Sequence, residues 1–280
     1  MTKTLGVGLL TGWGAGVAAL PEDARRAAGA RRIVPMARPA ITGERFRRAT
    51  RESLLGVAAV DAALRDSGLD RAAVAGSQTA LVYVTAAAYG ASNKNFIVAT
   101  SGSPARAEGG LSETGSGSAP APQRGGVYFP YTAPSAVPAE VAIEYGLTGG
   151  YVILVGGAVA TVDALWQASV MLAAGRATLA LVLAVETFEE CADLWARGRW
   201  ATPQPLVEAA ACAVLAGQGE GVAYGPGEAS TFEMMAARRA GTTLACAPLV
   251  GLALARAAGM SSARVTGHWR GRRAQVVVAT

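Results

Sequence analysis

The chain has 280 residues, of which 51% are hydrophobic and only 16% charged, and its formal net charge is +5. This balance excludes a disordered or solvating polypeptide, because such segments contain few apolar residues. The length suffices for one large domain or for two fused halves that share a core, and the apolar excess leaves room for a large partner interface.

The apolar residues occur in short runs. Long runs such as residues 151–155 and 179–185 fall well short of the ~20 apolar residues that a membrane-spanning helix needs, so we expect no transmembrane span. Residues 1–10 contain one lysine and a short apolar run, with no small-residue cleavage pattern after it. They predict a first strand and turn, not a signal peptide.

The cysteines Cys191, Cys212 and Cys246 have neither zinc-binding nor redox-motif spacing. An odd, scattered set of thiols is typical of a reducing cytoplasm, where we expect this protein. Cys212 and Cys246 lie among apolar residues and are predicted to pack in the core. The carboxylates of Glu189 and Glu190 disfavour a thiolate at Cys191, so a structural role is predicted there too. We expect no metal site and no cofactor.

Strand and helix signals alternate in the first half of the chain. Residues 3–9 predict a strand, and Thr50 is predicted to cap a helix that ends at Gly68. Residues 78–85 predict a second strand. Residues 101–126 are rich in Gly, Ser, Ala and Pro, which predicts a long mobile loop inside the domain.

The second half continues this alternation. Residues 137–145 predict a helix, 151–155 a buried strand, 163–174 a helix and 179–185 another buried strand. A strand over 209–216, a helix over 244–258 and a final strand over 274–279 follow. Apolar strands that alternate with helices indicate a largely parallel sheet covered on both faces. We therefore expect residues 1–280 to form a single α/β domain.

Three consecutive blocks resemble the β-ketoacyl synthases, in the order of that family. Residues 129–136 (FPYTAPSA) resemble the family's Phe-Pro-x-Thr-x-x-Asn-Ala, and residues 141–149 (VAIEYGLTG) resemble its Val-Ala-x-x-x-Gly-Leu-x-Gly. The strand 151–155 and a helix beginning with Asp163-Ala164-Leu165 follow, where the family has Thr-Ala-Cys-Ala-Ser-Gly with its nucleophilic cysteine.

Flanking segments extend this resemblance over most of the chain. Residues 5–14, 61–69 and 268–276 are similar to the family's first strand and turn, its Ala-Leu-x-Asp-Ala-Gly-Leu and its Phe-Gly-Phe-Gly-Gly-x-Asn-Ala. The chain is far shorter than a full synthase, and the gap falls between Ala216 and Leu244. The resemblance implies a thiolase-like layered α-β-α-β-α fold with a reduced second half.

The position of the family's nucleophile is occupied by Ala158. The family's cysteine lies nine residues after the glycine of Gly-Leu-x-Gly, which is Gly149 here, and counting back from Asp163 gives the same residue. A cysteine at that place is activated by the N-terminus of a helix. An alanine methyl group cannot form an acyl-enzyme, so we predict no catalytic residue.

The acid–base groups that the resemblance implies are missing as well. The family uses two histidines, in His-Gly-Thr-Gly-Thr and Asn-His-x-Phe-Gly stretches, whereas this chain has one, His268, next to Trp269. We interpret His268 as a partly buried or exposed residue, not a catalytic relic. The lysines Lys3 and Lys94 both lie outside the second half, where the family's active-site lysine lies. The chain is thus expected to have no independent activity.

Two further acidic residues have predicted roles. Glu186 ends a strand at a place where the family often has an acidic residue, and we expect it to bind backbone amides of the turn. Asp163 is either a buried hydrogen-bonding group or a polar residue at an interface.

The resemblance is best matched by a chain length factor, the inactive homologue that pairs with an active ketosynthase in type II polyketide, fatty-acid or aryl-polyene-like systems. It implies a heterodimer that shapes the acyl pocket and meets an acyl carrier protein. Pocket candidates are Phe129, Pro130, Thr132 and Ala158. Interface candidates are Val152, Ile153, Leu154 and Val155, because the strand before the nucleophile pairs across a two-fold axis in this family. Many such factors have Gln, not Ala, at the nucleophile position.

Other functions stay open at this point. A divergent acyl-thioester decarboxylase or acyltransferase that uses no cysteine would need preorganised donors around the thioester. A degenerate synthase could also merely bind acyl chains or a carrier protein. The arginines are scattered along the sequence without interleaved aromatic residues, so we expect no nucleic-acid partner. An anionic carrier fits this charge at least as well.

Overall fold

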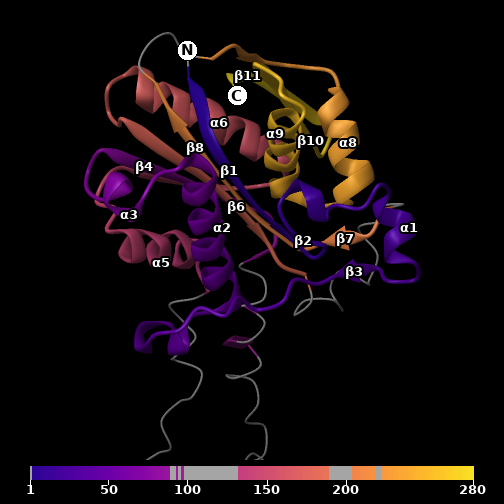
Figure 1. The fold of residues 1–280 in the computed structure, drawn as a ribbon, viewed down its shortest axis with the longest axis horizontal. Helices are drawn as coiled ribbons and strands as arrows, with labels where there is room; N and C mark the ends of the chain where they lie inside the picture. The colour runs from indigo at the N-terminus through magenta and orange to yellow at the C-terminus, as the bar shows by residue number, and fades with distance from the viewer. Residues whose placement is uncertain (1, 89–92, 94–95, 98–131, 189–203, 218–221) are drawn as a thin grey trace, which may run out of the picture.

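The computed structural model describes residues 2–88, 93, 96–97, 132–188, 204–217 and 222–280. The predicted loop over residues 101–126 lies outside this part of the chain. The main sheet has nine strands, five of which lie side by side in the order β1 (Lys3–Thr11), β8 (Ala209–Ala216), β6 (Leu179–Glu186), β4 (Thr79–Thr85) and β5 (Tyr151–Val155) (Figure 1). Strand β8 is antiparallel to both of its neighbours, whereas β4 is parallel to β5 and β6. The prediction of a largely parallel sheet is therefore wrong for the sheet as a whole, because three of its strand pairings are parallel and five are antiparallel.

Helices cover both faces of the main sheet. On one face lie α2 (Arg51–Ser67) and α5 (Ala136–Tyr145), and on the other lie α6 (Ala158–Ala173) and α9 (Ala247–Ala257) (Figure 1). Two glycines of β1 permit the close approach of α2. A Cβ atom at Gly8 would lie 2.3 Å from the carbonyl oxygen of Ala59, and one at Gly6 would lie 2.6 Å from the amide nitrogen of Ser67. Side chains at these positions would push α2 off the sheet.

The second half of the chain extends the same sheet past β1, through a parallel pairing of Lys3 with Ala279. Strands β10 (Ser262–Trp269) and β11 (Arg272–Ala279) form an antiparallel hairpin, and β9 (Tyr224–Gly225) pairs with β11. The hairpin alternates buried and exposed residues, and its buried face packs against α6 and α9. Helix α8 (Thr231–Ala240) packs beside α9. The layers follow the predicted thiolase-like fold, with a second half reduced to this hairpin and its helices.

The predicted helix ends are mostly confirmed. The Thr50 hydroxyl oxygen accepts a hydrogen bond from the Ser53 amide at 3.3 Å, and Gly68 and Gly146 end their helices with positive φ. Helix α6 begins at Ala158, before the predicted start at Asp163. The predicted helix over 244–258 begins as a 3-10 turn, Leu244–Cys246. Strand β10 and helix α8 were not predicted.

Short elements complete the described chain. They are β2 (Gly14–Ala15), α1 (Ala24–Ala28), β3 (Ile33–Val34), α3 (Arg71–Val74), β7 (Leu206–Val207) and the 3-10 helices Val17–Ala19 and Glu44–Arg48. Strands β3 and β7 pair in parallel as a separate two-stranded sheet. No helix in the described residues is long and apolar enough to cross a membrane.

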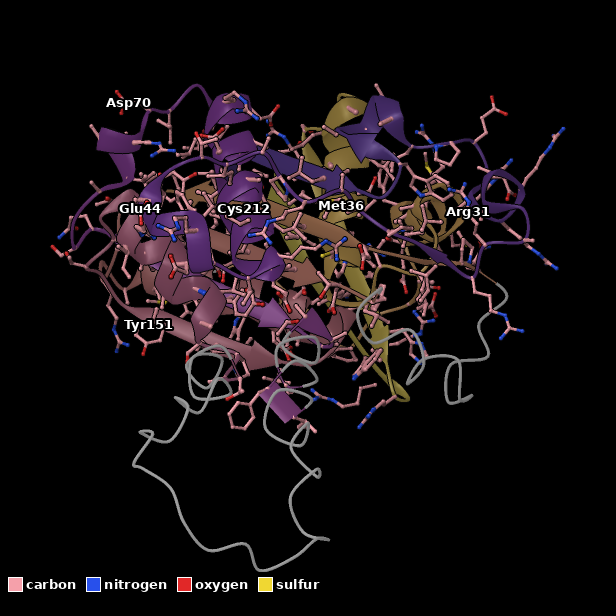
Figure 2. The ribbon with its side chains drawn as sticks, turned by 90° about the horizontal axis from the view of Figure 1, so that it is seen from below. Arg31, Met36, Glu44, Asp70, Tyr151 and Cys212 are labelled. Atoms are coloured by element: carbon pink, nitrogen blue, oxygen red, sulfur yellow. The ribbon has the colours of Figure 1, made fainter. Side chains whose placement is uncertain are left out.

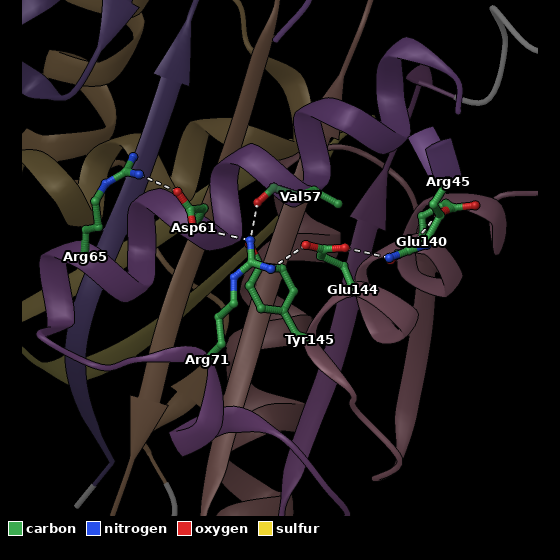
Figure 3. A network of polar contacts seen from close by, with 8 residues as sticks. All are labelled: Arg45, Val57, Asp61, Arg65, Arg71, Glu140, Glu144 and Tyr145. Atoms are coloured by element: carbon green, nitrogen blue, oxygen red, sulfur yellow. Dashed lines mark hydrogen bonds and ion pairs between the residues drawn. The ribbon is translucent and has the colours of Figure 1, made fainter. Parts of the chain in front are cut away.

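A polar network fastens α5 to the neighbouring helices (Figure 3). Glu144 of α5 binds both Arg71 of α3 and Arg45, and Arg45 also reaches Glu140 at 2.8 Å. The hydroxyl of Tyr145 donates a hydrogen bond of 3.0 Å to the carbonyl oxygen of Val57 in α2. These contacts fix the end of α5 that leads into β5.

Candidate functional site at the start of α6

Three strand ends meet where α6 begins. Strands β4, β5 and β6 run in the same direction, so their carboxyl ends lie at one edge of the sheet, the usual place for sites in such folds. From β5 the chain passes through Gly156 and Gly157 directly into α6, whose first residue is Ala158. Ala158 is buried. The structure thus places Ala158 at the start of a helix, as the family resemblance implied.

The start of α6 carries no side-chain cap. Gly157 precedes the helix and has no side chain to cap it, although its carbonyl oxygen accepts a hydrogen bond of 2.9 Å from the Ala160 amide. Free amides and the positive end of the helix dipole would stabilise an anion at this point. Ala158 presents only a methyl group, which has no lone pair for attack on a thioester. The local geometry of an activated nucleophile is therefore present without the nucleophile.

The hairpin of β10 and β11 packs directly on this helix start. A Cβ atom at Gly157 would lie 2.2 Å from ring atom Cε3 of Trp269, and one at Gly267 would lie 2.6 Å from the carbonyl oxygen of Ala158. The two glycines therefore allow β10 to touch the first turn of α6 with its backbone. The Trp269 indole occupies the space beside Gly157.

An apolar cluster lines the same place. It contains Ala87, Phe188, Leu206 and Leu244, with Trp269 packed against it. Leu244 has φ of +45°, in the left-handed region that leucine seldom adopts. Such strain costs on the order of 1–3 kcal/mol and concentrates at functional sites. The strained residue supports the location of the site.

Two buried hydroxyl groups flank this cluster. The Oγ1 atoms of Thr187 and Thr243 are buried, and neither has a hydrogen-bond partner among the described residues. Buried polar atoms without partners are rare in native proteins. Neither threonine was predicted from the sequence, because an isolated threonine carries no local signal.

Glu186 is a fully buried carboxylate beneath the site. It accepts hydrogen bonds from the backbone amides of Ala86 at 2.7 Å, Ala87 at 2.8 Å and Ala245 at 3.2 Å. Burial raises the pKa of Glu186 to about 8, although these three amides lower it in part. The expected role of Glu186, binding backbone amides of the turn, is confirmed. The carboxylate joins the ends of β4 and β6 to the turn before α9.

A second buried carboxylate, Glu208, was not predicted. It accepts hydrogen bonds from the amides of Met36 and Phe188, both at 2.7 Å, and forms an ion pair with Arg51 of α2. A glutamate inside an otherwise apolar run, residues 205–216, is the sequence signal that indicates such a paired buried charge. This pair holds the chain segments around the candidate site together.

Strand β5 forms one edge of the main sheet. It pairs with β4 and lies at the end of the strand order. Tyr151 and Val155 are 66% and 56% exposed, whereas Val152, Ile153 and Leu154 are half-buried against the chain's own core. The prediction of a buried strand is therefore wrong for the isolated chain. Apolar residues are also exposed on the helices at either face of the sheet, namely Ile143 of α5 and Trp166 and Val170 of α6.

The remaining predicted residues are distributed as follows. Phe129, Pro130 and Cys191 lie outside the described residues, and Thr132 is half-buried just before α5. The acyl pocket thus stays a prediction. Cys212 and Cys246 are buried, and burial raises the pKa of both thiols.

The structure shows the surroundings of two residues whose roles the sequence left open, and the first of them, Asp163, is half-buried. Asp163 accepts a hydrogen bond of 2.6 Å from the Tyr224 hydroxyl, and Tyr224 stacks on Trp166 with ring centroids 5.0 Å apart. Asp163 is therefore a hydrogen-bonding group that ties α6 to β9. His268 is exposed, while its neighbour Trp269 packs at the start of α6.

Solved structures with the same fold include complexes of the ketosynthase type. The ishigamide ketosynthase/chain length factor aligns with a TM-score of 0.68 and 16% identity, over 99% of this chain and 98% of that chain. A ketosynthase of a type II polyketide synthase, solved in complex with its acyl carrier protein, aligns with a TM-score of 0.74 and 14% identity, over 100% and 99% of the two chains. The ketosynthase ApeO in complex with its chain length factor ApeC from Xenorhabdus doucetiae aligns with a TM-score of 0.62 and 13% identity, over 100% of this chain and 99% of that chain.

At the sequence level, no curated protein matches the chain. The family profile of the β-ketoacyl synthase N-terminal domain, however, matches residues 37–231, which is more than half of the chain. The matched region contains α2, β4, β5, α6 and β6, and so includes the candidate site. The chain therefore belongs to the β-ketoacyl synthase family.

Proposed function

We propose that the chain is a non-elongating subunit that pairs with an active β-ketoacyl synthase, in the manner of a chain length factor. The observation that carries this proposal is Ala158 at the first position of α6, buried against β10. A helix start suited to a thiolate holds a methyl group there, so no acyl-enzyme can form at this atom. The chain retains the family's fold around a site without its nucleophile.

The free edge at β5 supports pairing with a second chain. Tyr151 and Val155 expose large apolar side chains. The outward-facing backbone N–H and C=O groups of an edge strand can also form hydrogen bonds with a strand of a partner. An obligate interface between such subunits buries roughly 2,000 Å² or more. A ketosynthase with an equivalent edge strand would cover this surface and would share the growing acyl chain with this subunit. We place this complex in the cytoplasm, with an acyl carrier protein as its substrate donor.

An independent acyl-thioester decarboxylase or acyltransferase finds less support. Such an enzyme needs donors that polarise the thioester carbonyl. The chain's single histidine, His268, is exposed, and the indole of Trp269 fills the space beside Gly157. The thiols of Cys212 and Cys246 are buried and protonated at neutral pH, because burial raises their pKa.

Co-expression with an active ketosynthase tests the proposal. We expect the chain alone to be poorly soluble and to elute with the ketosynthase as a 1:1 complex in size-exclusion chromatography. Elongation by the ketosynthase should require this chain, and intact-mass analysis after incubation with acyl carrier protein should find no acyl adduct on it. A monodisperse monomer, together with unchanged ketosynthase activity when the chain is omitted, would contradict the proposed function.

A further inference from the structure

The arginines in the described part of the chain lie in several environments. Seven of them form ion pairs with carboxylates, namely Arg45, Arg47, Arg51, Arg65, Arg71, Arg256 and Arg273. Another group gathers at one end of the molecule, on α1, the turn after it and the last turn of α8. We name this group the basic surface, and its members are Arg25, Arg26, Arg31, Arg32, Arg238 and Arg239.

Short contacts hold the basic surface together. The guanidinium group of Arg239 donates hydrogen bonds to the carbonyl oxygens of Leu20 at 2.9 Å and Pro21 at 3.1 Å, which joins α8 to the segment before α1. Arg31 stacks over Trp13 at 5.7 Å, and the Trp13 indole donates a hydrogen bond of 3.0 Å to Ala240 at the end of α8. The arginines from both ends of the sequence are therefore fixed side by side.

The basic surface has few compensating charges. None of its six arginines forms an ion pair with any residue that the structure describes. Glu22 and Asp23 are the acidic residues of this segment, which leaves a local excess of four positive charges in a chain whose net charge is +5. Figure 2 shows Arg31 among other nitrogen-tipped side chains, at the opposite end of the view from Tyr151 of β5. A partner on the basic surface would thus leave the β5 edge free.

The surface also has an apolar component. Glu22, Met235, Arg238 and Arg239 line an open groove of about 390 Å³, and the neighbouring Met234 is 58% exposed. Methionine and arginine are both enriched in protein interfaces. The guanidinium group of Arg31 already lies over the Trp13 ring, so a nucleobase cannot stack on that face of the ring. This combination suits an acidic protein helix better than a nucleic acid.

We propose that the basic surface is the docking site on this chain for the acidic carrier protein that delivers the acyl group. This inference rests on the proposed function, because a partner subunit of a ketosynthase works on carrier-bound chains. Acidic residues of the carrier would face the arginines, and an apolar residue between them would sit on Met235 in the groove. Complementary charge of this kind mainly speeds and orients the encounter.

Binding of a recombinant type II acyl carrier protein in its apo form tests this inference. The apo form has no phosphopantetheine arm, so binding reports on the protein surface and not on the acyl pocket. We expect the double variant R25E/R238E, within the complex of this chain with its ketosynthase, to bind the carrier about tenfold more weakly or worse. Raising the salt concentration should weaken wild-type binding in the same direction.

A matched variant controls for net charge. R176E/R264E changes the charge equally, at exposed arginines that form no ion pair within the described residues and lie outside the basic surface. It should leave affinity within about threefold of the wild type. Equal losses in both variants, or no loss in either, would overturn the proposal. So would a structured RNA that binds more tightly than the carrier with the same arginine dependence.

The same samples separate this inference from the proposed function. Size-exclusion chromatography shows whether R25E/R238E still assembles with the ketosynthase. An intact complex that binds the carrier as well as the wild type overturns the docking site alone. Failure of the wild-type chain to assemble with any ketosynthase overturns the proposed function instead.

Discussion

The indole ring of Trp269 lies against the backbone of Gly157, so closely that ring atoms Cε3 and Cδ2 would lie 2.2 and 2.3 Å from a Cβ atom at that glycine. Gly157 is the residue before α6, and Trp269 is the last residue of β10. The contact brings the hairpin of β10 and β11 onto the helix start where the family has its nucleophile. It suggests that the site is closed by a side chain as well as deprived of its cysteine.

Substitution of Gly157 by alanine should destabilise the protein by overpacking. Inserting a methyl group into a filled core costs about 1–3 kcal/mol. In a W269A background the same substitution should cost much less, because the space is empty, and the double-mutant cycle would measure the coupling. Gly225 provides a control, since a Cβ atom there meets nothing within 4 Å. Equal effects of G157A in both backgrounds in denaturant unfolding would contradict the contact.

Restoring a cysteine at Ala158 should not restore reactivity by itself. In a C191S background, A158C is expected to react slowly with a bulky maleimide, because position 158 is buried beneath β10. Adding W269A, or W269L if the alanine variant does not fold, should increase the labelling rate at least about tenfold, since access and thiolate character together control cysteine reactivity. Mass spectrometry locates the label, and circular dichroism checks the fold. Rapid labelling of A158C alone would show that Trp269 does not close the site.

Charges at the exposed positions of β5 should separate the subunits. V155D or Y151D places a carboxylate in the proposed interface without burying it in the free chain, because both residues are more than half exposed. A desolvated, unpaired charge costs about 2–5 kcal/mol, so affinity for the ketosynthase should fall at least about thirtyfold.

Position matters in this experiment. Val152 and Leu154 pack on the chain's own core, and aspartate there would also destabilise the isolated subunit. M260D, at another exposed apolar residue beyond α9, serves as the control. If M260D dissociates the complex as strongly as V155D, or if neither variant does, β5 is not the interface.

Glu186 should make stability fall as the pH rises towards neutrality. Burial raises its folded-state pKa to about 8 from the ordinary value of 4.5. Between these values the folded protein holds a proton that the unfolded chain has released, so the free energy of unfolding decreases as pH increases. The nearby Tyr83 and Cys246 stay neutral in this window, because burial raises the pKa of both.

The variant E186Q isolates this effect. Glutamine cannot titrate, so the difference in unfolding free energy between wild type and E186Q should change by an amount on the order of a few kcal/mol from pH 5 to pH 8, in favour of E186Q at high pH. The variant can be less stable at every pH, because an amide cannot accept from all three backbone amides as a carboxylate does. A pH-independent difference between the two proteins would refute the shifted pKa.

Elements with local signals could be predicted from the amino-acid sequence alone. Thr50 and Gly68 bound α2, Gly146 ends α5, and the apolar run 209–216 matches β8 in full. A cap or a turn depends on a few neighbouring residues, so its sequence signal is sufficient. The ordered family blocks also placed Ala158 at a helix start, because the spacing from Gly149 spans only a turn and one strand.

Which faces are covered, and which distant residues come into contact, could be learned only from the folded chain. An apolar strand such as β5 has the same composition whether it is central or at an edge, so its exposure depends on the lack of a second neighbouring strand beyond it among the described residues. Trp269 meets Gly157, and Arg51 meets Glu208, across more than a hundred residues of sequence. Six of the arginines that are scattered along the chain gather on one surface, because folding brings α1 and the end of α8 together. Contacts of this kind leave no periodic or local pattern in a single sequence.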